Sequence, residues 1–431
     1  MAIIPQPTLF SWHDITELGD LERLALVLDT LPDETLMRAL EDARGRGRND
    51  YPVRALWNSL VAGVVFQHPS VESLRRELAR NAQLRELCGF RGPNVPPASS
   101  YTRFLRQLMT HQMALQAVFG TLVDHLADAL PDWGQRTAID GKALASWAKK
   151  APNKAAEDGR RDRDADWGAK TYQGVDKAGR AWEKVSWWFG YKVHRLVDTP
   201  DELPLAWTLT KASVHDSRQA LPLVKHRDEH HPALRSRMTV LSADNGYDAT
   251  EIVTTLWDQC RIKPVIDIRH AWKDPDSTRS LLAFPTVTHN DRGEVFCHDP
   301  KTGQVHTMSN GGFEAARQRL KKRCPARYAG VSCTGPDPCP VAQEIRIPLD
   351  TDRRIVTPID QTSYTWEREC AHRTAVERVH SRLDVSFGCE LHTIRGMRKM
   401  PVRVGLALVV MAGALGRVRQ KRPQAMRRLV G

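Results

Sequence analysis

The apolar residues of the first 130 positions follow the spacing of helices. Between positions 53 and 65 they recur every three or four residues, as on one buried helical face. Ser70 is placed to cap a following helix through Leu74 and Leu78, and a further helix is expected to begin at Ser99 or Ser100, after two prolines. The pattern predicts an all-helical domain over residues 1–130.

Arginines are frequent on these predicted helices. Short helices that carry arginines suit docking on DNA, so we predict that residues 1–130 bind DNA. The alternative is a plain helical bundle with a solvated basic face. The arginines are Arg75, Arg76, Arg80, Arg103 and Arg106.

After residue 130 the pattern changes to short strands. Segments 136–144, 185–198, 203–210, 238–241 and 262–267 are apolar or alternate, as strands do. Helices are expected from Asp216 or Ser217 and over 248–259, whereas the polar segment 149–180 is typical of a mobile loop. This order of elements predicts a mixed α/β core.

Residues 270–362 interrupt that order. They are rich in Gly, Pro, Asp, Arg and Cys, with short strand-like pieces such as "GEVFCH" and "QEIRIPL". Helical spacing returns over 367–384 and again after Pro401. We therefore expect a core formed by residues 131–269 and 363–415, an inserted Cys-containing subdomain over 270–362, and a basic tail over 416–431.

The charge balance indicates a polyanionic partner. The 431 residues carry a formal net charge of +12, with a pI of about 9.4. Nucleic acid is the first candidate, and a merely soluble basic surface is the alternative. We expect no signal peptide and no membrane association, because the longest apolar run, 404–416, is too short to cross a bilayer. Eight scattered cysteines favour a cytoplasmic protein with reduced thiols.

Three carboxylates form a candidate catalytic set. The first predicted strand is expected to end on Asp140-Gly141, and Asp244-Asn245-Gly246 follows the strand at 238–241. Glu377 lies on a predicted helix, on one face with Arg373 and Ser381. Phosphodiester cleavage can use two Mg²⁺ or Mn²⁺ ions about 3.5–4 Å apart, and these hard cations prefer carboxylate oxygens. Taken singly, each acid is more often a cap than a catalyst.

The order of the segments resembles the bacterial insertion-sequence transposases, which have a DDE triad on a ribonuclease-H-like core. The segments are 47–90 with "PPASSYTRFLRQL", "AIDGKAL", "FGYKVHRLVDTPDELPLAWTLTKASVHDS", "LSADNGYDA" and "HRTAVERVHSRL". The resemblance implies that Asp140, Asp244 and Glu377 bind Mg²⁺ or Mn²⁺, and that Arg373 holds a DNA phosphate. Tyr247 and His215 lie inside matched motifs and are expected to support the site.

The same resemblance implies the reaction. The chain would hydrolyse transposon ends to expose 3′-OH groups, which then attack target DNA. Double-stranded DNA, as transposon inverted repeats and as target, would be the partner, with a homodimer on the DNA. One alternative is a ribonuclease-H-like nuclease without strand transfer, which would use the same triad. A second, of another class, is a non-catalytic DNA-binding protein derived from a transposase.

The chain departs from the family pattern on the glutamate helix. Some members carry a tyrosine and a lysine where this chain has Cys370 and Asp384. The DNA contacts of those two residues therefore cannot be transferred. Lys142, Lys192 and Arg378 are the candidate substitutes.

Two weaker patterns have competing interpretations. Cys297, Cys324, Cys333 and Cys339 could form a structural zinc site, but their irregular spacing favours unligated thiols. The pair Trp187-Trp188 favours packing in the core or in a hairpin, with base stacking as the alternative.

Overall fold

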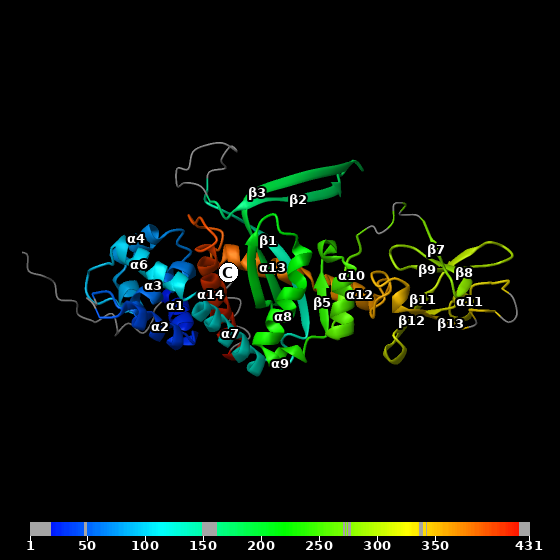
Figure 1. The fold of residues 1–431 in the computed structure, drawn as a ribbon, viewed down its shortest axis with the longest axis horizontal. Coiled ribbons are helices and arrows are strands. Elements are labelled where there is room, and N and C mark those ends of the chain that lie inside the picture. The colour runs from blue at the N-terminus through cyan, green and yellow to red at the C-terminus, as the bar shows by residue number, and fades with distance from the viewer. Residues whose placement is uncertain are drawn as a thin grey trace, which may run out of the picture.

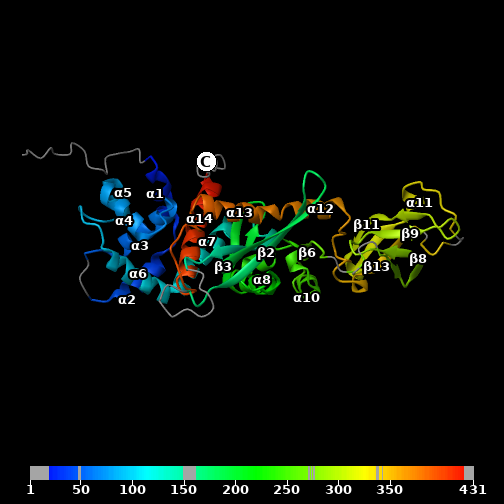
Figure 2. The same ribbon diagram turned by 90° about the horizontal axis from the view of Figure 1, so that it is seen from above.

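The molecule is elongated, with three parts that follow one another along its long axis. The computed structural model describes residues 19–46, 50–148, 162–269, 272, 274, 277–335, 339–341 and 343–421, without the side chains of 173 and 416–421. Helices lie at one end, a large sheet with its covering helices lies in the middle, and small sheets lie at the other end (Figures 1 and 2).

The helical part confirms the pattern expected before residue 130. Its apolar positions are buried, as in α3, where Val53, Trp57 and Val61 are at most 4% exposed. Ser70 caps α4 by accepting a hydrogen bond from the Ser73 backbone, as expected. The helices are α1 (Leu21–Thr30), α2 (Glu34–Arg44), α3 (Val53–Val65), α4 (Val71–Arg80), α5 (Ala82–Cys88), α6 (Ala98–Thr110) and α7 (Gln112–Ala129).

The central sheet is mixed, which confirms the α/β class. Within the described residues it has six strands in the order β2-β3-β1-β5-β6, and β4 pairs with β3 on the side opposite β1. β1 runs antiparallel to β3 and parallel to β5, and β5 runs parallel to β6. This order is consistent with the ribonuclease-H-like core that the resemblance implies. The strands are β1 (Arg136–Ala145), β2 (Asp166–Val175), β3 (Ala181–Asp198), β4 (Leu203–Lys211), β5 (Val240–Ala243) and β6 (Lys263–Ile266).

Two strand predictions were wrong. The first strand does not end at Asp140-Gly141, because β1 continues to Ala145 by pairing with β3. Residues 149–180 are not one loop: 149–161 lie outside the described residues, and Asp166–Val175 is strand β2. The loop prediction failed because exposed side chains lie on both faces of β2, so it lacks the apolar alternation that marks a half-buried strand.

Helices cover both sides of this sheet. On one side lies α8 (Ala220–His230), which follows a 3-10 turn over Asp216–Gln219 and is followed by the short helix α9 (Pro232–Arg235). On the other side lies α13 (Thr374–Val385) (Figure 2). The helix expected over 248–259 consists of α10 (Thr250–Thr254) and one π-helical turn, Thr255–Gln259. The continuous helix expected over 367–384 was wrong, because α12 (Tyr364–Ala371) and α13 (Thr374–Val385) are separated at His372 and Arg373.

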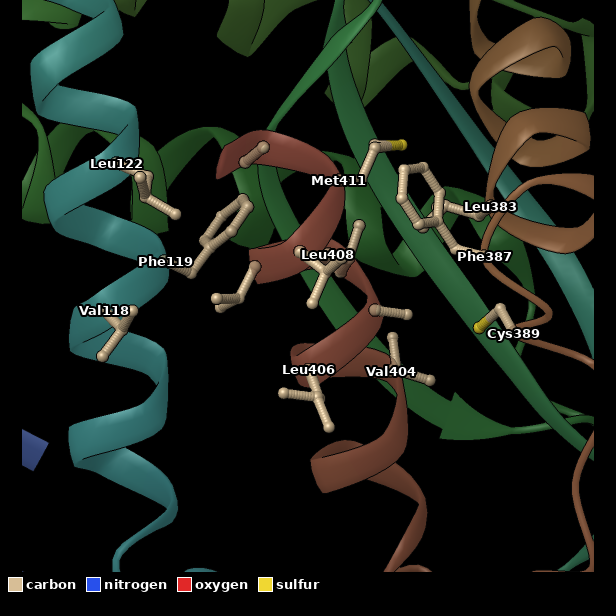
Figure 3. Packing of buried hydrophobic residues seen from close by; sticks show 14 of the residues in the cluster. Val118, Phe119, Leu122, Leu383, Phe387, Cys389, Val404, Leu406, Leu408 and Met411 are labelled. Carbon is tan, nitrogen blue, oxygen red and sulfur yellow. The ribbon is translucent and has the colours of Figure 1, made fainter. Parts of the chain in front are cut away.

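The last helix, α14 (Met400–Lys421), joins the helical part to the sheet. Figure 3 shows Phe119 of α7 pointing toward α14, with Met411 of α14 beside Phe387 on the other side. All three side chains are at most 5% exposed. The helical part and the sheet therefore share one apolar core.

Between β6 and α12 the chain forms two small sheets with a separate apolar cluster. In the described residues these are four-stranded, β10-β9-β8-β7, and three-stranded, β11-β12-β13. The strands are β7 (Arg279–Leu281), β8 (Phe284–His289), β9 (Val295–His298), β10 (Val305–Thr307), β11 (Ser309–Glu314), β12 (Arg319–Arg323) and β13 (Glu344–Pro348), with the short helix α11 (Pro325–Tyr328). We propose that this region is the inserted subdomain.

Candidate functional site

Asp140 lies on β1 where the parallel neighbour has ended. The last β1–β5 pair is Ala138 with Ser242, so Asp140 projects beside the segment that follows β5. It is 9% exposed. Its Oδ1 accepts a hydrogen bond of 2.8 Å from the Gly141 backbone, and its Oδ2 lies 4.0 Å from Nδ1 of His380 on α13.

Asp244 lies at the equivalent position after β5. It comes two residues after Ser242, just as Asp140 comes two residues after Ala138. Its side chain caps a 3-10 turn by accepting a hydrogen bond of 2.9 Å from the Gly246 backbone. Burial, and then the negative charge of Asp244, raises the pKa of Asp140 to about 6. The sheet therefore brings these two acids together.

Glu377 is directed toward an arginine instead. Its carboxylate accepts a hydrogen bond of 3.0 Å from Nη1 of Arg373, and its side chain is 55% exposed. Burial lowers the pKa of Arg373, but the negative charges of Glu377, Asp140 and Asp244 outweigh burial and leave that pKa raised. The Arg373 guanidinium is thus the group that interacts with all three predicted acids.

The carboxylates of Asp140, Asp244 and Glu377 are the kind of ligand that a hard divalent cation prefers, but they are not spaced as metal ligands in this structure. Among the described residues, no three His, Cys, Asp or Glu side chains lie close enough to hold a metal ion. The buried Asp140 beside Asp244 nevertheless concentrates negative charge, as the raised pKa of Asp140 records. Oxygen ligands of this kind suit Mg²⁺ or Mn²⁺.

A fourth acid at this site was not predicted. Asp216 follows β4, and its charge also contributes to the raised pKa of Asp140. Its Oδ1 accepts a hydrogen bond of 3.0 Å from Lys192 and lies 3.6 Å from Nδ1 of His194. A Cβ added to Gly141 would lie 2.5 Å from that oxygen and 3.0 Å from Nδ1 of His194, so a larger residue there would have to displace these side chains. The signal in the sequence was an acid at the start of the predicted helix, five residues after the end of β4.

Tyr247 and Arg195 are buried next to the acids. Tyr247 is 0% exposed, and no described residue accepts or donates a hydrogen bond at its hydroxyl. Burial first, and then the charges of Asp140 and Asp244 among its neighbours, raises the pKa of Tyr247 well above its usual value. Arg195 pairs with Asp140 across the β1–β3 ladder and is 2% exposed. Sequence analysis gave Tyr247 a supporting place and missed Arg195.

His215, the other expected supporting residue, has a local structural contact. Its ring accepts a hydrogen bond from the Ser217 backbone and so caps the 3-10 turn that carries Asp216. It therefore supports the site by positioning that turn.

The three candidate substitutes for family DNA contacts each have an acidic neighbour. Lys142 pairs with Asp384, and its Nζ also lies 3.1 Å from Glu390. Lys192 pairs with Asp216, and its Nζ donates a further hydrogen bond of 3.0 Å to the Val214 carbonyl. Asp384 occupies the position where some family members have lysine. Its pairing with Lys142 brings a lysine from β1 to the same place. The third substitute, Arg378, pairs with Glu202.

A second basic region lies between the helical part and the core. A surface cavity there is lined by α6 and by the segment that precedes α14. Its cationic residues are Arg106, Arg395, Arg398 and Lys399. By contrast, Arg75 and Arg80 of α4 pair with glutamates of their own helix. This basic surface is therefore formed by α6 together with the segment that precedes α14.

The four cysteines of the small sheets lie near one another. Burial, and then the neighbouring Cys324, Cys333 and Cys339, raises the pKa of the Cys297 thiol to about 11. A Cβ added to Gly335 would lie 3.4 Å from the Cys333 sulfur and 3.8 Å from the Cys339 sulfur. All four are free thiols, and in the described part of the chain they are not at metal-ligand spacing.

No described helix is both long and apolar enough to cross a membrane.

Comparison with known families agrees with this geometry. The family model described as "Transposase domain (DUF772)" matches residues 13–107, over most of the helical part. No curated protein matches the chain. The model described as "Transposase DDE domain" matches residues 154–411, which begins after Asp140 but includes Asp244 and Glu377. Because that match covers more than half of the 431 residues, the chain belongs to the transposase DDE domain family.

Proposed function

We propose that this chain is the DNA transposase of an insertion sequence. It would cut the transposon ends by metal-dependent phosphodiester hydrolysis and join the resulting 3′-OH ends to target DNA. The observation that carries the proposal is the coupling of Asp140 and Asp244, each two residues beyond the last pair of the parallel strands β1 and β5. Membership of the transposase DDE domain family independently supports a transposase function.

Asp140 and Asp244 are the proposed holders of Mg²⁺ or Mn²⁺, and Glu377 would complete the set. When bound, such ions activate the attacking water and stabilise the leaving oxygen. Asp140 must be ionised to act as a ligand, so metal binding displaces a proton from this carboxyl below about pH 6. Glu377 needs only a rotamer change to leave Arg373, because its side chain is half-exposed.

Arg373 is the proposed phosphate contact. It already lies within the field of all three acids, and a guanidinium released from Glu377 can donate two hydrogen bonds to a phosphate. In the cleavage step a water oxygen bonds to phosphorus, and the bond from phosphorus to the 3′ oxygen breaks. In the joining step that 3′ oxygen attacks a target phosphate and displaces another 3′ oxygen.

The partners follow from this reaction. Double-stranded DNA would be held by the helical domain over residues 1–130 and by the core over residues 131–269 and 363–415. The basic cavity formed by Arg106, Arg395 and Lys399 supports a DNA path between these two parts. Two transposon ends have to be joined together, so we propose a homodimer on DNA.

The test is cleavage of the element's own terminal sequences by the purified chain in Mg²⁺. We expect Asp244→Asn to abolish cleavage and Asp350→Asn, a substitution at a 93% exposed side chain, to leave it unchanged. Full activity in Asp244→Asn would reject the catalytic assignment. A plasmid target added to the same reaction separates the alternatives. Cutting without joining indicates a nuclease, and binding without cutting indicates a non-catalytic relative.

A further inference from the structure

A two-stranded arm projects from the central sheet. We call β2 and residues 181–190 of β3 the arm. Over these residues β3 pairs with β2, whereas from Tyr191 onward it pairs with both β1 and β4. Figures 1 and 2 show the arm extending beyond the other strands. An isolated two-stranded ribbon is only marginally stable in water. A ribbon of this length is therefore expected to be stabilised by a binding partner.

The register of the arm separates its side chains onto two different faces. Cross-strand partners in an antiparallel pair point to the same side. We call one side the lysine face. It begins with Asp166 paired with Gly190, and its four outer pairs are Gly168 with Trp188, Lys170 with Ser186, Tyr172 with Lys184, and Gly174 with Trp182. We call the other the apolar face, and its pairs include Trp167 with Phe189, Ala169 with Trp187, Thr171 with Val185, and Val175 with Ala181.

On the lysine face, two tryptophan rings lie over glycines. A Cβ added to Gly168 would be 2.3 Å from the Trp188 ring, and one added to Gly174 would be 2.8 Å from the Trp182 ring. Each ring therefore occupies the space above the opposite strand that a side chain would fill. Trp182 remains 45% exposed, so part of its ring surface is open to a ligand.

Aromatic and cationic groups alternate along the same face. Tyr172 is 45% exposed, and the Lys170 ammonium lies 5.8 Å from the centroid of its ring. Lys184 is the cross-strand partner of Tyr172 and is exposed. Within the described chain, neither lysine has a carboxylate within ion-pair distance. The four pairs extend over roughly 20 Å at about 6.7 Å for each two-residue step.

The inner part of this face is close to the candidate catalytic acids. The arm leaves the sheet at Gly190, which pairs with Ala145 of β1, the strand that carries Asp140, and the positive charge of Lys170 acts on both Asp140 and His380. A ligand on the lysine face would therefore run from the acids toward the tip of the arm. That position suits a DNA strand whose scissile phosphate is at Asp140.

We propose that the lysine face binds an unpaired DNA strand next to the scissile phosphate, with bases stacked on Trp182 and Tyr172 and phosphates bound by Lys170 and Lys184. This inference rests on the proposed function, which supplies the DNA. Base stacking on aromatic side chains tolerates any sequence, and lysines attract the phosphates. A protein partner would instead prefer the apolar face, where Trp187 is 61% and Val175 67% exposed.

The two faces provide a matched experiment on the full-length chain. The probe is a short fluorescein-labelled single strand of mixed sequence, with the same sequence as a duplex, in EDTA so that no cleavage occurs. We expect Trp182→Ala and Tyr172→Ala each to weaken single-strand binding about tenfold. Trp187→Ala removes the same side-chain type from the apolar face and should leave binding within twofold of the unchanged protein.

Further variants keep the test independent of folding. Trp182→Phe retains a ring and should restore most of the affinity, whereas Lys184→Gln should reduce the slope of log affinity against log salt by about one. Equal loss in Trp182→Ala and Trp187→Ala, or loss of duplex binding alone, would overturn the proposal. Normal single-strand binding without Mg²⁺-dependent cleavage would reject the proposed function and leave the arm proposal standing.

Discussion

Replacement of Asp140 by asparagine should stabilise the metal-free protein at neutral pH. Burial and the charge of Asp244 raise the pKa of Asp140 from 3.8 to about 6 in the folded chain. The difference of about 2 pKa units corresponds to about 3 kcal/mol at roughly 1.4 kcal/mol per unit. Asparagine keeps the carbonyl oxygen that accepts the Gly141 hydrogen bond but has no charge to bury.

The pH dependence of this effect has a definite sign. Below about pH 4 the carboxyl is protonated in both the folded and the unfolded chain, and the substitution should change stability little. Between about pH 4 and 6 the unfolded chain releases the proton first, so the unchanged protein loses stability as pH rises. Above about pH 6 we expect Asp140→Asn to be more stable by up to about 3 kcal/mol.

Urea unfolding in EDTA, followed by tryptophan fluorescence at pH 4.5 and pH 7.5, measures this difference. Asp350→Asn, at a 93% exposed side chain, is the control and should change stability at neither pH. Asp140→Asn as stable as the unchanged protein at pH 7.5 would refute the reasoning. So would a stabilisation of the same size at both pH values, since charge burial would then not be its cause.

Three further predictions concern contacts of the site and the small sheets. Arg373→Ala should weaken DNA binding in Ca²⁺ by tenfold or more, measured by fluorescence anisotropy, because a charge-assisted phosphate contact is lost. Lys142→Asp should destabilise the fold by about 1–2 kcal/mol in thermal unfolding, and the added change Asp384→Lys should recover at least half, because the pair is partly buried. The four neighbouring cysteines are not at metal-ligand spacing in the described chain, so Co²⁺ added to the reduced protein should give no thiolate-to-metal absorption band; a band that Cys297→Ser removes would indicate a structural metal site instead.

The sequence was sufficient to predict the two coupled acids. Short apolar runs that precede Asp140 and Asp244 form buried strands, and Gly246 lies in the 3-10 turn that follows Asp244, whereas Gly141 lies within β1. Sequence spacing alone does not give the parallel pairing of β1 with β5 that sets the acids at equivalent positions. The break before α13 was also not predictable, since neither Gly nor Pro marks His372 and Arg373.

Strand β2 of the arm was missed for a physical reason, whereas residues 185–190 of the arm were predicted as part of a strand. A strand is recognised by alternation of buried and exposed residues, and in β2 exposed side chains lie on both faces, Lys170 and Tyr172 on one and Trp167 and Ala169 on the other. Its turn depends on Asp176, whose carboxylate accepts hydrogen bonds of 2.8 Å from Ala178 N and 2.9 Å from Arg180 N. Gly179 has a φ of +78°, which favours glycine. Both signals resemble those of a polar loop.

The pair formed by Lys142 and Asp384 changes which cations can reach DNA. The family lysine at position 384 would add positive charge beside the acids, whereas here Lys142 is neutralised by Asp384 and also faces Glu390. Lys142 therefore supplies a lysine near position 384, but the carboxylates of Asp384 and Glu390 cancel its positive charge. Lys170 on the arm is the remaining lysine whose charge lowers the pKa of Asp140, and it has no acidic partner among the described residues. In this chain, the positive charge beside the scissile phosphate should therefore come from the arm and from Arg373 rather than from the end of α13.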